Sequence, residues 1–298
     1  MLTLIGWTAP LFLSLAAQQR PLCFRAKLMQ NMEFKSQPTS NLVAMAYETY
    51  NEDDYWKLIT ELHKRGSSCE FNIAKDLVNS NDAVKREIGA DILGQLGWSK
   101  KNPFHTESVS LLIELLSDKN GEVVASAGFS LGHKNDTRAV PRLLKLVGHS
   151  NPKVRYGVVS ALSGLENDRA IEALIKLSHD NDFDVRNWAT FGLGSQCDID
   201  TPALRAALFE RVSDKEYEIR GEALVGLAQR NDLRIKSAIL KELEGEFEGS
   251  WVLEAAQLLA LPEFCEPLIR LKNQMVGKNE YFLREANEAI NACCAKET

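Results

Sequence analysis

Apolar residues recur with a helical period inside segments of similar sequence, and short polar turns separate these segments. The clearest copies are DVRNWATFGLGSQCD, EIRGEALVGLAQRND, EVVASAGFSLGHKND and KVRYGVVSALSGLEND. With two looser copies, the segments start at six β-branched residues: Val84, Val123, Val154, Val185, Ile219 and Val252. Their spacings are 39, 31, 31, 34 and 33 residues, with a mean of 33.6. Repeats of this length are typical of two-helix solenoids.

Each segment has one apolar helical face. With the β-branched residue as position 0, position 4 is small or apolar, position 7 is small and position 8 is leucine. In the copy from Val185 these positions hold Ala189, Gly192 and Leu193. At 100° per residue, positions 0, 4, 7 and 8 fall within one stripe about 100° wide. We therefore expect each segment to be a helix that buries this stripe, with small residues allowing a neighbouring helix to approach closely.

The turns before these helices repeat a pattern of acids, amides and bases. Candidate N-cap residues occupy the same place in five copies: Asp82, Asn120, Asn151, Asp182 and Asp214. Their side-chain oxygens can accept hydrogen bonds from the free N–H groups of the first helical turn. A base follows position 0 in four copies, as Lys85, Arg155, Arg186 and Arg220. This register predicts a ladder of side-chain contacts between stacked turns.

This repeating pattern resembles the HEAT-like repeat of the phycobilin-lyase type, whose residue string reads approximately D-x-x-V-R-x-x-A-x-x-A-L-G-x-L-x-D-x-x-A. NDFDVRNWATFGLG, followed by EIRGEALVGLAQRND, resembles more narrowly the YibA-type HEAT-repeat proteins of bacteria. The resemblance implies an all-α, right-handed α-solenoid of two-helix repeats. We expect one solenoid over residues 41–298, with about seven to eight helix pairs and no internal domain boundary.

The first 32 residues do not fit the repeat. Residues 2–17 are apolar and have the length of a signal-peptide core, but no Lys or Arg precedes them and Pro10 interrupts them. We interpret residues 1–32 as an unstructured extension, or as the product of an assigned start upstream of the true one at Met29 or Met32. The alternative is secretion through residues 1–17.

The six cysteines show no metal-binding or disulfide framework in the sequence. They are Cys23, Cys69, Cys197, Cys265, Cys293 and Cys294, and no CxxC pair occurs. We interpret them as small thiols in a reducing cytoplasm, which places the protein in the cytoplasm.

The second helix of each repeat has a further face that points away from the core stripe. At positions 2, 3 and 6 this face is aromatic or small rather than basic, and an exposed surface of this kind usually marks a partner site. The predicted partner-binding residues are Phe129, Tyr156, Asn187, Trp188, Phe191 and Val225. The alternative is that these side chains fill gaps between adjacent repeats.

Charge and the absence of catalytic motifs narrow the function. The chain has 35 Lys and Arg against 41 Asp and Glu, a net charge of −6, which argues against a protein that mainly neutralises phosphates. None of the five histidines precedes a glutamate, so the His-Glu pairs of di-iron solenoid enzymes are missing. His149 and His179 occupy equivalent turns but lack further placed ligands. We predict no catalytic residues, no metal and no cofactor.

The resemblance to YibA-type proteins also implies a function, since members of that group occur beside Rhs-type polymorphic toxins and are suspected immunity proteins. We therefore expect a non-enzymatic solenoid, monomeric when unbound, that neutralises a toxin through its concave face. The net charge suits a basic protein partner rather than nucleic acid or a membrane. The alternative is a HEAT-like alkylpurine DNA glycosylase or another DNA-repair or lyase-type enzyme, in which Trp188 and Asp184 would take part.

Overall fold

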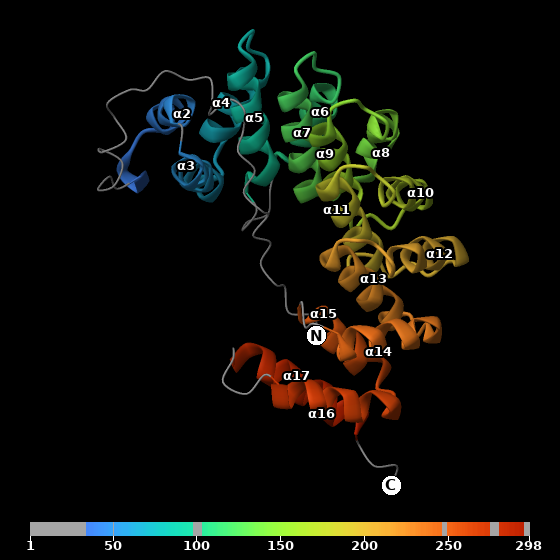
Figure 1. The fold of residues 1–298 in the computed structure, drawn as a ribbon. Helices are drawn as coiled ribbons and strands as arrows, with labels where there is room; N and C mark the ends of the chain where they lie inside the picture. The colour runs from blue at the N-terminus through green and yellow to red at the C-terminus, as the bar shows by residue number, and fades with distance from the viewer. Residues whose placement is uncertain (1–33, 50, 98–102, 246–248, 275–279, 295–298) are drawn as a thin grey trace. The chain divides into compact units, whose positions relative to one another are not determined.

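The computed structural model describes residues 34–49, 51–97, 103–245, 249–274 and 280–294, and every regular element in these ranges is a helix (Figure 1). Chain contacts divide the protein into two compact units, unit 1 (residues 1–161) and unit 2 (residues 162–298). This confirms the all-α solenoid class, whereas a single uninterrupted stack over residues 41–298 stays a prediction. The leader-like residues and the alternative starts at Met29 and Met32 lie outside the described residues.

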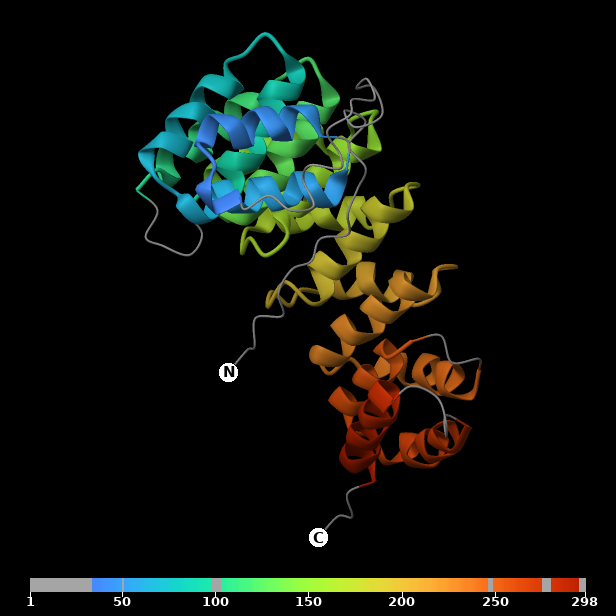
Figure 2. The same ribbon diagram turned by 90° about the vertical axis from the view of Figure 1, so that its left-hand side faces the viewer.

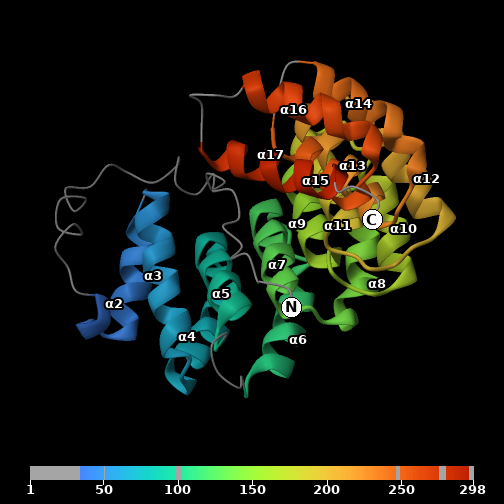
Figure 3. The same cartoon turned by 90° about the horizontal axis from the view of Figure 1, so that it is seen from below.

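Unit 1 is built from helix pairs that follow one another in the chain. Its elements are η2 (Phe34–Ser36), α2 (Thr39–Glu48), α3 (Glu52–Arg65), α4 (Ser68–Val78), α5 (Ala83–Gln95), α6 (His105–Leu115), α7 (Gly121–Lys134), η3 (Thr137–Ala139), α8 (Val140–Leu143), η4 (Leu144–Leu146) and α9 (Pro152–Leu162), whose last residue is the first of unit 2. The second helices α3, α5 and α7 pack in succession, and α2, α4 and α6 form the other layer (Figure 3).

Unit 2 repeats this arrangement. Its elements are α10 (Asp168–Leu177), α11 (Phe183–Gly194), α12 (Pro202–Arg211), α13 (Tyr217–Gln229), η5 (Leu233–Ile235), α14 (Lys236–Glu244), α15 (Trp251–Leu259), η6 (Pro262–Phe264), α16 (Cys265–Gln274) and α17 (Glu280–Cys293). Helices α11, α13, α15 and α17 pack in succession as the second-helix layer, and their order is visible from yellow to red in Figure 2.

The predicted core stripe is confirmed. In α11, Val185, Ala189 and Leu193 are fully buried, and the matching residues of α7, α9 and α13 are buried as well. Small residues bring the second helices together as expected. A Cβ atom on Gly226 of α13 would lie 2.5 Å from the Gly194 Cα of α11, so the two backbones are in direct contact.

Side-chain caps start most of the second helices. Asp82, Asn120 and Asp182 accept hydrogen bonds from backbone N–H groups of the first turns of α5, α7 and α11, as predicted. The prediction for Asp214 is wrong, because Glu216 occupies the N-cap of α13 and caps nothing through its side chain. The Asp214 carboxylate is instead an ion-pair partner of Arg186 in the turn before.

The predicted ladder of bases and acids is present, with one correction of register. The Nη1 atoms of Arg155, Arg186 and Arg220 each donate to the carbonyl oxygen six residues earlier, at 2.7–3.1 Å. In the first copy this contact is made by Arg86, which donates to the carbonyl of Ser80, and not by Lys85. The repeat there is one residue out of the predicted register, because each ladder arginine lies four residues after its N-cap residue.

Three of the ladder arginines also form ion pairs with acids further along the chain. Arg86 reaches Asp118 through two hydrogen bonds of 2.6 and 2.9 Å, and the Arg186 Nε atom lies 3.0 Å from the Asp214 Oδ2 atom. Arg220 makes the corresponding contact with Glu242 at 2.9 Å. Arg86 and Arg186 therefore tie their own turns to the next one and Arg220 ties its turn to α14, which confirms the predicted ladder for these copies.

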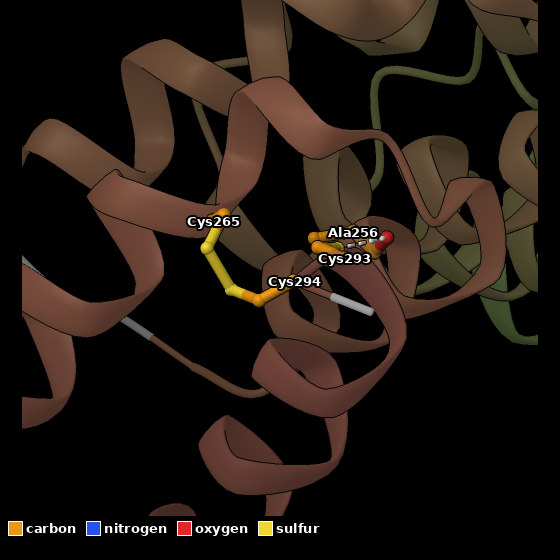
Figure 4. Close-up of a disulfide and its surroundings, with 4 residues drawn as sticks. All are labelled: Ala256, Cys265, Cys293 and Cys294. Carbon is orange, nitrogen blue, oxygen red and sulfur yellow. Dashed lines mark hydrogen bonds between the residues drawn. A yellow bond between two sulfur atoms is a disulfide. The ribbon is translucent and has the colours of Figure 1, made fainter. Parts of the chain in front are cut away.

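The interpretation of all cysteines as free thiols is wrong. Cys265 and Cys294 form a disulfide, with their Cα atoms 5.2 Å apart (Figure 4). The two residues are 29 positions apart, and only the antiparallel pairing of α16 and α17 brings them together. Cys69 is an exposed free thiol, Cys197 and Cys293 are buried free thiols, and Cys23 lies outside the described residues.

Candidate functional site

The predicted partner-binding residues of unit 1 form an aromatic pair. The rings of Phe129 on α7 and Tyr156 on α9 meet edge to face with their centroids 4.9 Å apart. Phe129 is half-buried, but Tyr156 is only 7% exposed. The expectation of an exposed Tyr156 is therefore wrong, because its side chain packs against the neighbouring second helix.

The predicted residues of unit 2 lie on α11 and α13. Trp188 and Phe191 form a second edge-to-face pair, with ring centroids 5.4 Å apart, and both are half-buried. Asn187 is also half-buried, and its Oδ1 atom is buried without a hydrogen-bond partner in the described part of the chain. Val225 is 2% exposed because α13 packs between α11 and α15, so the expectation that it is exposed is wrong.

Asp184, Trp188 and Phe191 share one face of α11, at helical positions i, i+4 and i+7. We call these three residues the α11 surface. Partial burial and the nearby Asp182 carboxylate raise the pKa of Asp184. The α11 surface thus joins a rigid aromatic pair to a carboxylate whose charge is only partly solvated.

A second carboxyl group lies on α13, between α11 and α15. Glu222 accepts a hydrogen bond of 2.9 Å from the Trp251 Nε1 atom and one of 3.2 Å from the Ser195 hydroxyl. Burial raises the pKa of Glu222 to about 7, and the nearby Glu254 adds to the shift. Both partners are neutral donors, so this carboxyl group lies among groups that do not cancel its charge.

Carboxylates continue along the second-helix layer of unit 2. Partial burial and the neighbouring Glu285 raise the pKa of Glu254 on α15. Glu254 in turn raises the pKa of Glu222 on α13, so like charges from three successive helices act on their neighbours. We call Glu222, Glu254 and Glu285 the carboxylate row. Sequence reasoning missed it, since a scattered glutamate in each repeat carries no sign that three helices align them.

The two units differ in charge. Unit 1 has 19 Lys and Arg against 16 Asp and Glu, whereas unit 2 has 16 against 25. The net charges are +3 and −9, so the acidity of the chain comes entirely from unit 2. The α11 surface and the carboxylate row therefore belong to a strongly acidic unit.

Unit 1 contains a buried polar cluster around Asp91 on α5. The Asp91 carboxylate accepts hydrogen bonds from the hydroxyls of Tyr55 and Ser126, and burial raises its pKa to about 6. His63 donates through Nε2 to the Asp91 carbonyl oxygen at 3.0 Å, and burial lowers its pKa to about 4.

This cluster links α3, α5 and α7 rather than forming a catalytic triad. In a triad the imidazole lies between the hydroxyl nucleophile and the carboxylate. Here Ser126 is bound directly to Asp91, and the His63 ring faces the backbone. The hydroxyl groups of Tyr55 and Ser126 both donate hydrogen bonds to the Asp91 carboxylate.

The histidines that the sequence placed in equivalent turns have ordinary partners. The Nδ1 atom of His149 accepts from the Asn151 N–H at 3.1 Å, and the Nε2 atom of His179 lies 2.7 Å from Glu210. Within the described ranges no three His, Cys, Asp or Glu side chains are grouped to hold a metal ion. A search of the same ranges also finds no helix that could cross a bilayer.

Comparisons with known proteins match this architecture. Residues 109–194 match the family model described as HEAT repeats. Over 73 residues the chain is 37% identical to protein YibA of Escherichia coli strain K12, a segment that covers 24% of this chain and 26% of that protein. The matched segment thus spans about a quarter of the curated relative.

Solved structures extend the likeness to nearly the whole chain. The X-ray structure of Escherichia coli YibA aligns with a TM-score of 0.67 and 24% identity, over 94% of this chain and all of that one. Kap95p, in a complex described as inducing the switch loops of RanGDP to adopt the GTP-bound conformation, aligns with a TM-score of 0.57 and 15% identity, over 94% of this chain and 43% of Kap95p. These likenesses confirm the HEAT-type solenoid fold and the resemblance to YibA.

Proposed function

We propose that this chain is a non-enzymatic protein-binding solenoid that holds a basic protein against the second-helix layer of unit 2. The observation that carries the proposal is the charge of unit 2, −9, together with the carboxylate row on three successive helices. A solenoid that acts by binding also agrees with the Kap95p likeness, since that protein's structure is described as a complex with RanGDP.

The electrostatics favour a cationic partner. Glu254 raises the pKa of Glu222, Glu285 raises that of Glu254, and no ion pair of Glu254 occurs among the described residues. Lysine or arginine side chains of a partner would remove this repulsion on binding. Complementary charge also increases the rate of association and makes it depend on ionic strength.

The α11 surface supplies the apolar anchor that charge alone does not give. Trp and Tyr are enriched among residues that dominate binding energy, and rigid aromatic groups lose little entropy when they are bound. Trp188 is already held in place by its edge-to-face contact with Phe191. The expectation for Phe129, Tyr156, Asn187 and Val225 is weaker, since two of these side chains are buried.

The finer form of the proposal is neutralisation of a polymorphic toxin of the Rhs type. It rests on the resemblance to YibA-type proteins and on the acidity of unit 2, which suits a basic nuclease domain. Such a protein would act by covering the toxin's active site, as an immunity protein does.

The test uses the purified full chain and the toxin domain encoded beside its gene. We expect a stable complex, protection of cells that express the toxin, and at least about tenfold weaker binding when salt rises from 50 to 200 mM. Trp188→Ala should weaken binding by about 30-fold, the effect of a loss of roughly 2 kcal/mol. Phe209→Ala is the matched control, because Phe209 is an exposed aromatic residue of α12, in the other layer.

The possible outcomes test the toxin hypothesis, the role of the α11 surface and the glycosylase alternative separately. Absence of both complex and protection removes the toxin hypothesis. Equal effects of the two variants remove the α11 surface from the binding site. Excision of alkylated bases from DNA by the purified chain, lost in Trp188→Ala, would replace binding with the glycosylase alternative.

A further inference from the structure

The C-terminal helix pair is closed by a covalent bond at one end. Cys265 is the first residue of α16, and Cys294 directly follows α17 (Figure 4). Both cysteines are partly exposed, so a reductant in solution can reach the bond. The disulfide therefore holds the end of the last helix against the start of the preceding one.

The side chains of α17 that are fully buried are small. They are Ala286, Ala289 and Cys293, while the larger Phe282, Leu283 and Ile290 are half-buried. The ion pairs of its Arg284 are made within the helix, with Glu285 and Glu288. Small side chains remove less apolar surface from water than large ones, so much of the packing of α17 comes from side chains that stay partly exposed.

One contact of α17 with α15 is even unfavourable. Glu285 lies close enough to Glu254 of α15 to raise its pKa, which is the effect of like charges. A hydrogen bond between these helices runs from the Cys293 Sγ atom to the Ala256 carbonyl oxygen at 3.3 Å. The disulfide thus adds a covalent attachment to the packing of the last helix on α15 and α16.

Cys293 is adjacent to the disulfide but does not take part in disulfide exchange. It is 2% exposed, and burial raises its pKa to about 11, so it remains a neutral thiol. Since a thiolate is the attacking species in disulfide exchange, the bond does not rearrange to Cys293 on its own. Its opening needs an external thiolate.

We propose that the Cys265–Cys294 disulfide is a redox-controlled lock on α17, and that its reduction by a dithiol releases α17 and uncovers the side of α15 that carries Ala256. One thiolate of the dithiol attacks a sulfur of the bond and forms a mixed disulfide, and the other cysteine leaves as a thiolate and takes a proton. The second thiol of the dithiol then closes its own disulfide and frees the remaining cysteine. The protein gains two thiols, and the dithiol is oxidised.

The chain contains its own reporters for this release. Cys293 is covered only while α17 is docked on α15. Cys69 is exposed on α4, and Cys197 is buried elsewhere in unit 2. The experiment alkylates the full chain in short pulses of N-ethylmaleimide, before and after treatment with dithiothreitol, and measures each cysteine by peptide mass spectrometry.

In the oxidised protein we expect rapid alkylation of Cys69 and protection of the other cysteines. After reduction, Cys265 and Cys294 should react, and Cys293 should react at least about tenfold faster than before, while Cys197 stays protected. Cys294→Ser should give the fast alkylation of Cys293 without reductant, and Cys69→Ser, the matched control, should not.

Three results would overturn the proposal. Alkylation of Cys265 and Cys294 without reductant would show that no bond is present. Continued protection of Cys293 after reduction would show that α17 stays docked. An equal rise at Cys293 and Cys197 would show that unit 2 loosens as a whole rather than at α17.

Discussion

Replacing Glu222 with glutamine should change how the stability of the protein depends on pH. In the folded state the pKa of this carboxyl group is raised to about 7, from 4.5, mainly by burial. Glutamine keeps the shape of the side chain and a carbonyl oxygen that can accept from Trp251. Its amide group can donate to the Ser195 hydroxyl, so both hydrogen bonds have a substitute.

The sign follows from the direction of the shift. Below pH 4.5 Glu222 is protonated in both the folded and unfolded states, and stability is at its full value. Between pH 4.5 and 7 the unfolded chain ionises while the folded chain keeps its proton, so stability falls as pH rises. The rise in pKa from 4.5 to about 7 corresponds to a loss of roughly 3 kcal/mol. Above pH 7 Glu222→Gln should therefore be more stable than the unchanged protein, by about 2 to 3 kcal/mol.

The assay is urea unfolding followed by circular dichroism at pH 5, 6, 7 and 8. The two proteins should have similar midpoints at pH 5 and diverge steadily up to pH 8. Glu266→Gln is the matched control, because the Glu266 side chain is 82% exposed, and its curve should follow that of the unchanged protein. Parallel pH profiles for Glu222→Gln and the unchanged protein would refute the reasoning, since Glu222 would then ionise as it does in water. Asp91 adds a slope of the same sign, which cancels in this comparison.

Three further perturbations test the packing. Arg186→Ala leaves the partly buried Asp180 carbonyl oxygen without this donor and removes one of the two arginines that pair with Asp214, and should lower the free energy of unfolding by about 2 kcal/mol in chemical denaturation. Gly226→Ala forces α13 away from α11 and should cost about 2 kcal/mol, whereas Gly148→Ala, whose added methyl group meets nothing within 4 Å, should change the melting temperature by no more than about 2 °C. Reduction of the Cys265–Cys294 bond, which joins residues 29 positions apart, should cost about 3 to 4 kcal/mol, and an unchanged melting curve would contradict this.

Much of the fold follows from local patterns in the sequence. The stripe of Val185, Ala189 and Leu193 is buried as a 3.6-residue period requires, and Asp182 caps its helix as its chemistry predicts. These features depend on contacts within one repeat, which recur in every copy. Period and composition therefore identify them without a structure.

Features that depend on contacts between repeats could not be predicted from the sequence. Tyr156 and Val225 lie on the predicted outer face of their helices, but neighbouring helices cover them. A helical wheel shows the faces of one helix and not the helices that pack against it. The carboxyl group of Glu222 acquires its properties from Trp251, 29 residues further on. The disulfide likewise depends on the way α17 runs back along α16.

The first repeat shows a different limit. An apolar residue at Val84 matched the β-branched start of the other copies, and so Lys85 was aligned with the ladder arginines. The contact from Arg86 to the Ser80 carbonyl shows that distance from the cap, rather than side-chain similarity, sets the register. When copies of a helical repeat are aligned by their apolar residues alone, the alignment can be wrong by one residue.

The ladder contact has a consequence for how such an array can change. Each ladder arginine donates to the carbonyl oxygen six residues earlier, and so spans its own turn; the four are Arg86, Arg155, Arg186 and Arg220. The contact can form only if the turn has this length. Insertion or deletion of one residue in these turns would separate the guanidinium from its carbonyl acceptor. Whole repeats can be gained or lost without breaking this relation. The array is therefore built to vary in units of a complete helix pair, with its turns fixed in length.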